Sequence, residues 1–405
     1  MSEHGSMNGA EWLARALAGA GTTHVFFVES VLRRTLLQLK DLRVTPILAH
    51  SEKAAAYMAD GYARIAGRPG VCMAQAVGAA NLASGLQDPF LGRSPVVALT
   101  GRKPSSFQHR NAYQEIPHAP LFAAVTKFST TLDLTSELPR LLRHAWRAAL
   151  ADTPRPTHLD FSGHQGDEIE LGQTSEPPVI DPEARRIPAH RPMASAGEIE
   201  RAAAVLTAAR RIAIVAGDGA AASQAGPEVL ALAEALQAPV ATTLGARGII
   251  PTRHRLSVGV AGSYSAPPAN RIVHGADLVL FIGCDTGDQV TLNWTVPPPE
   301  TKIVQIDADP LEIGRSYPNI TGLVGDPKAT LVYLNQVIGN QVIGKPARDS
   351  GFVDEAARIV ADWRATMMPL CENDSAPIRV ERLCAEITRA LPSDAVLVAD
   401  TGYSG

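Results

Sequence analysis

The chain has 405 residues, with 37 basic and 41 acidic side chains, a formal net charge of −4 and 45% apolar residues. This charge balance excludes the strongly basic surface that is typical of nucleic-acid and membrane-surface binding proteins. No apolar run approaches the roughly 18 residues of a membrane span, and the four cysteines show neither a metal-binding spacing nor the density of a disulfide scaffold. We therefore expect a compact cytoplasmic protein of two or three domains.

Apolar and amphipathic segments alternate through the first 170 residues, which we predict to form the N-terminal domain. Apolar runs predict strands at residues 24–28, 45–49, 71–76, 95–100 and 157–161. Amphipathic spacing predicts helices at residues 11–20, 52–66 and 138–151. Short buried strands separated by helices are typical of a parallel sheet that is covered on both faces.

A polar, proline-rich linker at residues 171–195 precedes a second alternating region, the predicted central domain at residues 196–335. Helices are predicted at residues 197–211 and 228–237, and strands at residues 212–216, 240–244, 278–283 and 303–307. We therefore expect a second doubly wound domain. Residues 336–379 are predicted as a linker with a helical stretch, and residues 380–405, a helix and then a strand at 395–400, as the start of a third domain.

The turn from Gly217 to Ala222 matches the loose dinucleotide-binding pattern GxGxxA between a strand and a helix, so a dehydrogenase is one reading. That pattern also needs an acidic residue at the end of the next strand, which here ends in Thr242 and Thr243. A tight strand-to-helix turn is therefore the favoured interpretation. No cluster of histidine and cysteine has the spacing of metal ligands, and we predict no metal site in this chain.

Glu52 is the residue whose position most strongly indicates chemistry. It lies where a predicted strand passes into a helix, at the edge of the sheet where open α/β folds bind ligands. The helix dipole also favours a carboxylate there, so a purely structural role is the alternative. The small residues 54–56 and the strand-end loops at 78–81 and 113–115 favour the functional interpretation.

The ordered motifs resemble the thiamine-diphosphate-dependent enzymes of the acetolactate synthase, pyruvate oxidase and benzoylformate decarboxylase group. The resemblance rests on the Glu-x-x-Ala signature that runs from residue 51 to 64, and on the loop at 76–81. It also rests on the strand at 95–101 and on the Tyr-Gln-Glu motif at 113–115. The central region is similar to the family's central domain at 242–251, 275–283 and 303–314, so the resemblance covers nearly the whole chain.

This resemblance implies decarboxylation and carbon–carbon bond formation on a 2-oxo acid, with thiamine diphosphate as the cofactor. In this family a buried carboxylate bonds the aminopyrimidine ring and favours the tautomer that removes the C2 proton, a role that would fall to Glu52. Gly78 and Asn81 would border the pyrimidine, and Gln114 would face the substrate. His109 and His118 are the candidate acid–base groups on that side.

The family binds magnesium and the diphosphate in a third domain through Gly-Asp-Gly and a later Asn, a pair that this sequence does not contain. The resemblance therefore predicts a chain that lacks most of that domain and is inactive without it. Gly402, Tyr403 and Ser404 would form its first loop, against the diphosphate. A homodimer or homotetramer, or a separate subunit carrying that domain, is the implied assembly.

A non-catalytic FAD- or ADP-binding or regulatory protein of the same fold is the alternative function. Central domains of this family sometimes hold such a nucleotide, and Gly217, Gly283 and Asp307 lie at the ends of predicted strands. A central domain that only packs and dimerises is the competing interpretation of the same residues.

Overall fold

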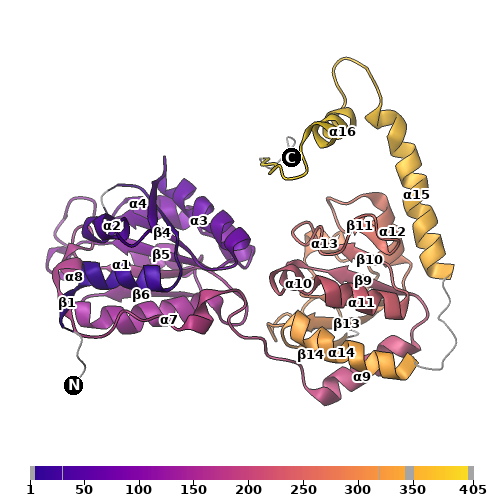
Figure 1. The fold of residues 1–405 in the computed structure, drawn as a ribbon, viewed down its shortest axis with the longest axis horizontal. Coiled ribbons are helices and arrows are strands. Elements are labelled where there is room, and N and C mark those ends of the chain that lie inside the picture. Colours follow the sequence, from indigo (N-terminus) through magenta and orange to yellow (C-terminus); the bar gives the residue numbers. More distant parts are fainter. Residues whose placement is uncertain (1–4, 30, 319, 343–350, 400–405) are drawn as a thin grey trace. The chain divides into compact units, whose positions relative to one another are not determined.

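The computed structural model describes residues 5–29, 31–318, 320–342 and 351–399. The chain divides into two compact units, Met1–Met193 and Ala194–Gly405. Each unit contains a six-stranded sheet whose strands all run parallel, with helices on both faces (Figure 1). The predicted α/β class with two doubly wound sheets is confirmed, while the predicted domain and linker boundaries remain predictions.

The first unit combines a two-stranded antiparallel pair, β1 and β8, with a parallel sheet in the order β3-β2-β4-β5-β7-β6. Its strands are β1 (Met7–Asn8), β2 (His24–Phe27), β3 (Thr45–Leu48), β4 (Gly70–Gln75), β5 (Val96–Gly101), β6 (Phe128–Leu132), β7 (Thr157–Phe161) and β8 (Gln173–Thr174). Its α-helices are α1 (Gly9–Gly19), α2 (Arg33–Leu39), α3 (Glu52–Ala66), α4 (Gly78–Gly85), α5 (Gln87–Leu91), α6 (His118–Ala123), α7 (Leu138–Leu150) and α8 (Asp167–Leu171). Short 3₁₀ turns are η1 (Ser105–Phe107), η2 (Thr135–Glu137) and η3 (Pro182–Arg185).

Alternate side chains of each strand in this sheet enter two different cores. On β5, Val97 and Leu99 pack with α1, α2, α7 and α8, whereas Val96 and Ala98 pack with α3, α4 and α6. The chain passes from β2 outward to β3 and then returns to β4 on the other side of β2. The carboxyl ends of β2 and β4 therefore form the point where the strand order reverses, the usual ligand-binding edge of such a sheet.

The second unit has the strand order β11-β10-β9-β12-β13-β14. Its strands are β9 (Ile212–Ala216), β10 (Val240–Thr242), β11 (Ser257–Val260), β12 (Leu278–Ile282), β13 (Lys302–Asp307) and β14 (Ile320–Val324). Its helices are α9 (Ala196–Ala208), α10 (Asp218–Ala222), α11 (Gly226–Leu236), α12 (Pro267–His274), α13 (Asp288–Thr291), α14 (Pro327–Val342), α15 (Gly351–Cys371) and α16 (Val380–Ala390).

Helix α15 is attached to the second unit by its first turns. Phe352 is buried in the core beside α12, and the guanidinium of Arg211 lies 4.3 Å from the centre of the Phe352 ring. Arg211 also forms an ion pair of 2.9 Å with Glu355 on the next turn of the same helix. This helix therefore contributes apolar side chains to the core of the second unit.

The sequence predictions differ from the structure in several elements, of which two groups of strands are informative. Residues 395–399 of the predicted strand at 395–400 have no regular structure, because no strand lies beside them within the described chain to complete a hydrogen-bonded ladder. Strands β6, β11 and β14 were not predicted, since they lie at sheet edges, are only partly buried and carry polar residues or glycine.

The described helices contain no segment long and apolar enough to cross a membrane. All four cysteines have free thiols, and Cys72 and Cys284 are buried. Burial raises the pKa of both of these thiols, so they behave as small apolar residues in the two cores.

The packing of the second sheet predicts the effect of removing a core side chain. Leu280 on β12 is fully buried, whereas Leu311 is 73% exposed. We expect Leu280→Ala to lower the free energy of unfolding by about 2–5 kcal/mol, because it leaves a cavity between the sheet and its helices. Leu311→Ala is the matched control, with an expected change below about 0.5 kcal/mol. Urea denaturation measures both, and equal effects would contradict the described packing.

Candidate active site

Glu52 occupies the first turn of α3, directly after the carboxyl end of β3. Ser51 begins the helix, because its Oγ accepts a hydrogen bond of 3.1 Å from the backbone N–H of Ala54. This N-cap fixes where the helix starts and so fixes the position of the next residue. The Glu52 side chain is partly exposed at the ligand-binding edge of the sheet, as the sequence predicted for its location.

Helix α4 approaches α3 closely through two glycines. A Cβ atom at Gly78 would lie 2.4 Å from Oε1 of Glu52, and a Cβ at Gly85 would lie 2.8 Å from the Cβ of Ala56. Glycine at position 85 therefore allows the two helices to meet, whereas glycine at position 78 leaves room for the Glu52 side chain. The Glu52 carboxylate therefore lies over the first turn of α4.

Asn81 lies one turn further along α4 and contacts the same carboxylate. Its Nδ2 donates a hydrogen bond of 3.1 Å to Oε2 of Glu52. Glu52, Gly78 and Asn81 therefore lie together, although residues 52 and 81 come from different strand–helix units. The cofactor-binding role of Gly78 and Asn81 remains a prediction.

The remaining residues of the signature around Glu52 form contacts within α3 and between α3 and its neighbours. Asp60 is buried and accepts two hydrogen bonds of 2.9 Å from the guanidinium of Arg64. The Tyr62 hydroxyl forms a hydrogen bond of 2.7 Å with Oγ1 of Thr23, next to β2. The small residues of α3 pack against the sheet and α4. Tyr62 and the small residues thus position the helix that carries Glu52, whereas the Asp60–Arg64 pair stabilises the helix itself.

The loop before α6 brings Gln114 to the end of β4. Nε2 of Gln75, the last residue of β4, donates a hydrogen bond of 3.1 Å to Oε1 of Gln114. Gln114 and His109 both have positive φ angles, 62° and 60°, which non-glycine residues seldom adopt. His109 is exposed, and its backbone N–H donates to Oε1 of Glu115 at 3.1 Å. The substrate-side roles of His109 and Gln114 remain predictions.

His118 lies below this edge of the sheet and is only 4% exposed. Its Nε2 is 2.9 Å from the carbonyl oxygen of Ala76, and its Nδ1 is 2.9 Å from Oδ1 of Asp160. Both ring nitrogens therefore face groups of the protein itself. The predicted acid–base role of His118 is untested, and this geometry favours a role in holding the loop that contains Ala76.

Three further polar residues of this region were not singled out by the sequence. Thr100 on β5 and His158 and Asp160 on β7 are all buried around the ring of His118. The signal was present, since His158 and Asp160 alternate with apolar residues in a strand that is otherwise fully buried. A buried polar face in a central parallel strand is unusual and indicates a hydrogen-bonded network.

Gly217 and Gly283 follow β9 and β12 at the point where the second sheet reverses its strand order. A Cβ at Gly217 would lie 2.2 Å from the carbonyl oxygen of Gly283, and that oxygen accepts a hydrogen bond from the N–H of Gly219. These glycines therefore let two backbones touch. Asp307 is buried, and its Oδ1 accepts from the N–H of Asp309 at 2.9 Å. Nucleotide binding by these residues remains a prediction.

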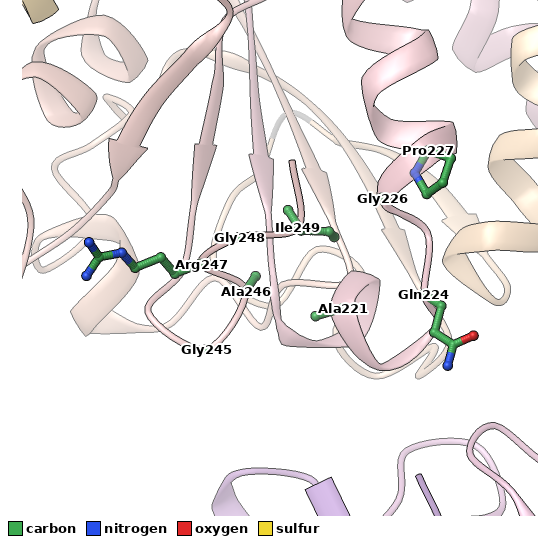
Figure 2. A pocket seen from close by; sticks show the side chains of 9 residues that line it. All are labelled: Ala221, Gln224, Gly226, Pro227, Gly245, Ala246, Arg247, Gly248 and Ile249. Carbon is green, nitrogen blue, oxygen red and sulfur yellow. The ribbon is translucent and has the colours of Figure 1, made fainter. Parts of the chain in front are cut away.

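A pocket of about 390 Å³ lies beside these loops and was not predicted. Figure 2 shows the Arg247 and Gln224 side chains on opposite sides of it, with Ile249 between them. Its lining is formed by Ala221, Gln224, Gly226, Pro227, Gly245, Ala246, Arg247, Gly248 and Ile249. The glycines after β10 were the available sequence signal.

Gly402, Tyr403 and Ser404, the predicted diphosphate loop, lie outside the described residues. Among the residues that the structure does describe, one group has three potential metal ligands close together, namely His118, His158 and Asp160. The proposed cofactor residues around Glu52 belong to a different cluster.

The fold and the site define a doubly wound α/β protein with a carboxylate at a strand end, against a glycine-containing helix. Two family models match the chain. The model described as "Thiamine pyrophosphate enzyme, N-terminal TPP binding domain" matches residues 7–121. The model described as "Thiamine pyrophosphate enzyme, central domain" matches residues 199–334. The chain belongs to the thiamine pyrophosphate enzyme family.

Several curated relatives are similar over most of this chain. A protein named probable acetolactate synthase large subunit from Methanocaldococcus jannaschii is 32% identical, over 95% of this chain and 64% of its own length. The protein of the same name from Methanococcus aeolicus is 29% identical, over 98% of this chain and 68% of its own length. The acetolactate synthase isozyme 2 large subunit of Escherichia coli is 31% identical, over 82% of this chain and 59% of its own length. The chain thus spans about two thirds or less of the length of these relatives.

The contact between Gly78 and Glu52 predicts that Gly78→Ala changes the site more than the fold. The added methyl group displaces the end of a flexible side chain, so we expect the free energy of unfolding to stay within about 1 kcal/mol of wild type. The Asn81–Glu52 hydrogen bond should be lost, which the NMR signals of the Asn81 side-chain amide would report. Gly61→Ala on α3, where a Cβ meets no atom within 4 Å, is the control and should leave those signals unchanged. An unchanged Asn81 amide in Gly78→Ala would contradict the described contact.

The burial of His158 predicts a specific loss of stability in acid. Burial lowers the pKa of His158 to about 3, with a smaller opposing effect of Asp160. Below pH 6.5 the unfolded chain binds a proton at this residue that the folded protein does not. The contribution of His158 to the free energy of unfolding is therefore fully present above pH 6.5. It falls by about 1.4 kcal/mol per pH unit as the pH decreases from 6.5 toward 3.

His158→Gln removes this titration, so its free energy of unfolding should fall less steeply between pH 6.5 and 4.5 than that of wild type. Urea denaturation at a series of pH values measures the two slopes. Comparison of slopes is independent of any constant destabilisation by the substitution. Identical slopes would show that His158 does not resist protonation in the folded protein.

Proposed function

We propose that this chain acts in thiamine-diphosphate-dependent carbon–carbon bond chemistry on a 2-oxo acid, of the acetolactate synthase type. The observation that supports the proposal best is the Glu52 carboxylate, which lies at the ligand-binding edge of the first sheet over Gly78 and is held by Asn81. The names of the similar proteins support the same reaction class. The dehydrogenase and the non-catalytic alternatives receive no comparable support.

The residues around Glu52 suit the pyrimidine half of the cofactor. A partly exposed carboxylate is able to bond a ring nitrogen, and Gly78 provides a surface without a side chain beside it. Thiamine diphosphate, when bound, supplies the carbanion equivalent that the amino acids lack. Asn81 holds Oε2 of Glu52, and we assign to Oε1 the proton exchange with the pyrimidine.

The finer cofactor assignments belong to the same proposal. Magnesium would accompany the diphosphate, outside the cluster around Glu52. FAD or ADP is a candidate ligand of the second unit, where the pocket of about 390 Å³ lies beside α10 and α11. Gln114, tied to the end of β4 by Gln75, is the candidate contact to the substrate.

The assembly that we propose is a homodimer or homotetramer, or a complex with a separate subunit that carries the diphosphate-binding part. Several similar proteins are named large subunits, which favours the presence of a second kind of subunit in those proteins. We also propose a cytoplasmic location, which the free thiols of the four cysteines support.

Glu52→Gln tests the catalytic assignment. We expect the substitution to slow product formation from a 2-oxo acid by about 100-fold or more, because the amide does not exchange a proton. The enzyme is assayed with added thiamine diphosphate and Mg²⁺ in two forms. One is the 405-residue chain alone, and the other is this chain fused to the remaining part of the archaeal relative from Methanocaldococcus jannaschii. The rate of hydrogen–deuterium exchange at C2 of the cofactor is measured in parallel.

Glu11→Gln is the matched control, because Glu11 is also an acidic residue in the first turn of a helix of the same unit. It removes a favourable interaction with the helix dipole without touching the site, and should leave both rates at the wild-type level. Normal C2 exchange in Glu52→Gln, or an equal loss in Glu11→Gln, would overturn the catalytic role of Glu52.

A further inference from the structure

A chain of buried polar groups lies behind the turn between β4 and α4. Oγ1 of Thr100 is 2.7 Å from Oδ1 of Asp160 and 2.7 Å from Nε2 of His158. Nδ1 of His158 is 2.8 Å from Oγ of Ser129, which lies at the far end of this chain of polar groups. His118 forms the near end. Thr100, His118, His158 and Asp160 are each less than 5% exposed, so each polar group depends on the others for its hydrogen bonds.

The directions of these hydrogen bonds follow from the groups themselves. The carbonyl of Ala76 only accepts, so Nε2 of His118 donates to it. Thr100 donates to Asp160 and therefore accepts from Nε2 of His158, which leaves Nδ1 of His158 to accept from Ser129. Nδ1 of His118 lies 2.9 Å from Oδ1 of Asp160, so the second ring nitrogen of His118 also faces a polar partner. Each ring nitrogen of His118 and His158 thus has a hydrogen-bond partner.

Ala76, whose carbonyl accepts the hydrogen bond from His118, has an unusual backbone conformation. Ala76 has a φ angle of 28°, a conformation that is costly for a residue with a side chain. Its N–H donates to the carbonyl of Gly101 at 2.7 Å, and its own carbonyl accepts from the N–H of Ala79 at 3.0 Å in the first turn of α4. His118 supplies the second hydrogen bond to that carbonyl. The turn is therefore held from the sheet, from the helix and from the buried ring.

We propose that His118, supported by Asp160, is a positioning residue that holds the Ala76 turn and, through it, places Gly78 and Asn81 of α4 against the Glu52 carboxylate. The inference rests on the proposed function only in the purpose that it assigns to Glu52. Since α4 begins two residues after Ala76, a shift of this turn moves the start of the helix. The contacts of Glu52 with α4 depend on where that helix starts.

Hydrogen bonding explains the cluster better than a bound metal ion does. The ligand atoms of His118, His158 and Asp160 lie within 4.8 Å of one another. The hydroxyl of Thr100 already contacts Asp160 and His158 at 2.7 Å, and the ring of Phe122 stacks on His158 with 3.6 Å between the ring centres. An ion would have to displace the hydroxyl from this position.

Two conservative substitutions distinguish the contacts of the two ring nitrogens of His118. The amide of glutamine approximates the position of Nε2, so His118→Gln keeps a donor for the Ala76 carbonyl. The amide of asparagine approximates Nδ1, so His118→Asn keeps the contact with Asp160 and loses the contact with Ala76. Hydrogen exchange of the full chain without cofactor, followed by mass spectrometry, measures the protection of amides 77–82. We expect about ten-fold faster exchange in His118→Asn and protection close to wild type in His118→Gln.

The Asn81 side-chain amide gives a second readout, which tests the effect on the site itself. Glu52→Gln, introduced into the wild-type protein or into His118→Gln, should shift the NMR signals of the Asn81 amide. Introduced into His118→Asn, where the contact is already lost, it should leave these signals unchanged. Ser129→Ala breaks the far end of the polar chain without touching Ala76, and should leave amides 77–82 protected.

Equal protection in His118→Asn and His118→Gln would overturn the proposal, as would an equal loss in Ser129→Ala. A Glu52-dependent shift that survives in His118→Asn would do the same. Both measurements are made without thiamine diphosphate, so their results are independent of the catalytic assay of Glu52→Gln.

Discussion

The close approach of α4 to α3 is the constraint on which the proposed site depends. Gly78 and Gly85 have no Cβ atoms, and a Cβ at either position would collide with Glu52 or with the turn that follows it. This approach places a carboxylate from the end of one strand–helix unit against the first turn of the next. The proposed proton exchange at Oε1 of Glu52 requires that placement, because a carboxylate that is free to rotate would not present one oxygen in a fixed position.

The parallel sheets explain why the site lies where it does. Alternating apolar side chains enter two separate cores, which fixes the strands and leaves the loops at their carboxyl ends to carry polar residues. In the first unit those loops contain Glu52, Asn81 and Gln114. In the second unit the equivalent loops meet at Gly217 and Gly283, where two backbones are in contact and the nearby pocket is offset toward α10 and α11.

The sequence predicted the central strands because apolar residues predominate in most of them, and it predicted α3 from residue 52 to residue 66 from its helical pattern and the glycine that ends it. In the structure Ser51 and Gly67 cap the two ends of this helix. It also predicted that Glu52 lies at a strand end. It did not predict the network of His118, His158 and Asp160. Their hydrogen bonds join β5, β7 and the loop before α6, and such pairings depend on strand order, which a single sequence does not encode locally. For the same reason the sequence does not reveal that the ring of His118 is buried, and its substrate-side role stays a prediction.

The most direct test of the central claim is the ¹⁵N NMR signal of thiamine diphosphate labelled at the pyrimidine ring nitrogen that faces Glu52. With the chain fused to the remaining part of the archaeal relative, the signal should shift on binding in wild type. In Glu52→Gln the bound cofactor should give a signal close to that of the free cofactor, because the carboxylate hydrogen bond is absent. The same shift in both proteins would show that another group bonds the ring, and would contradict the role of Glu52.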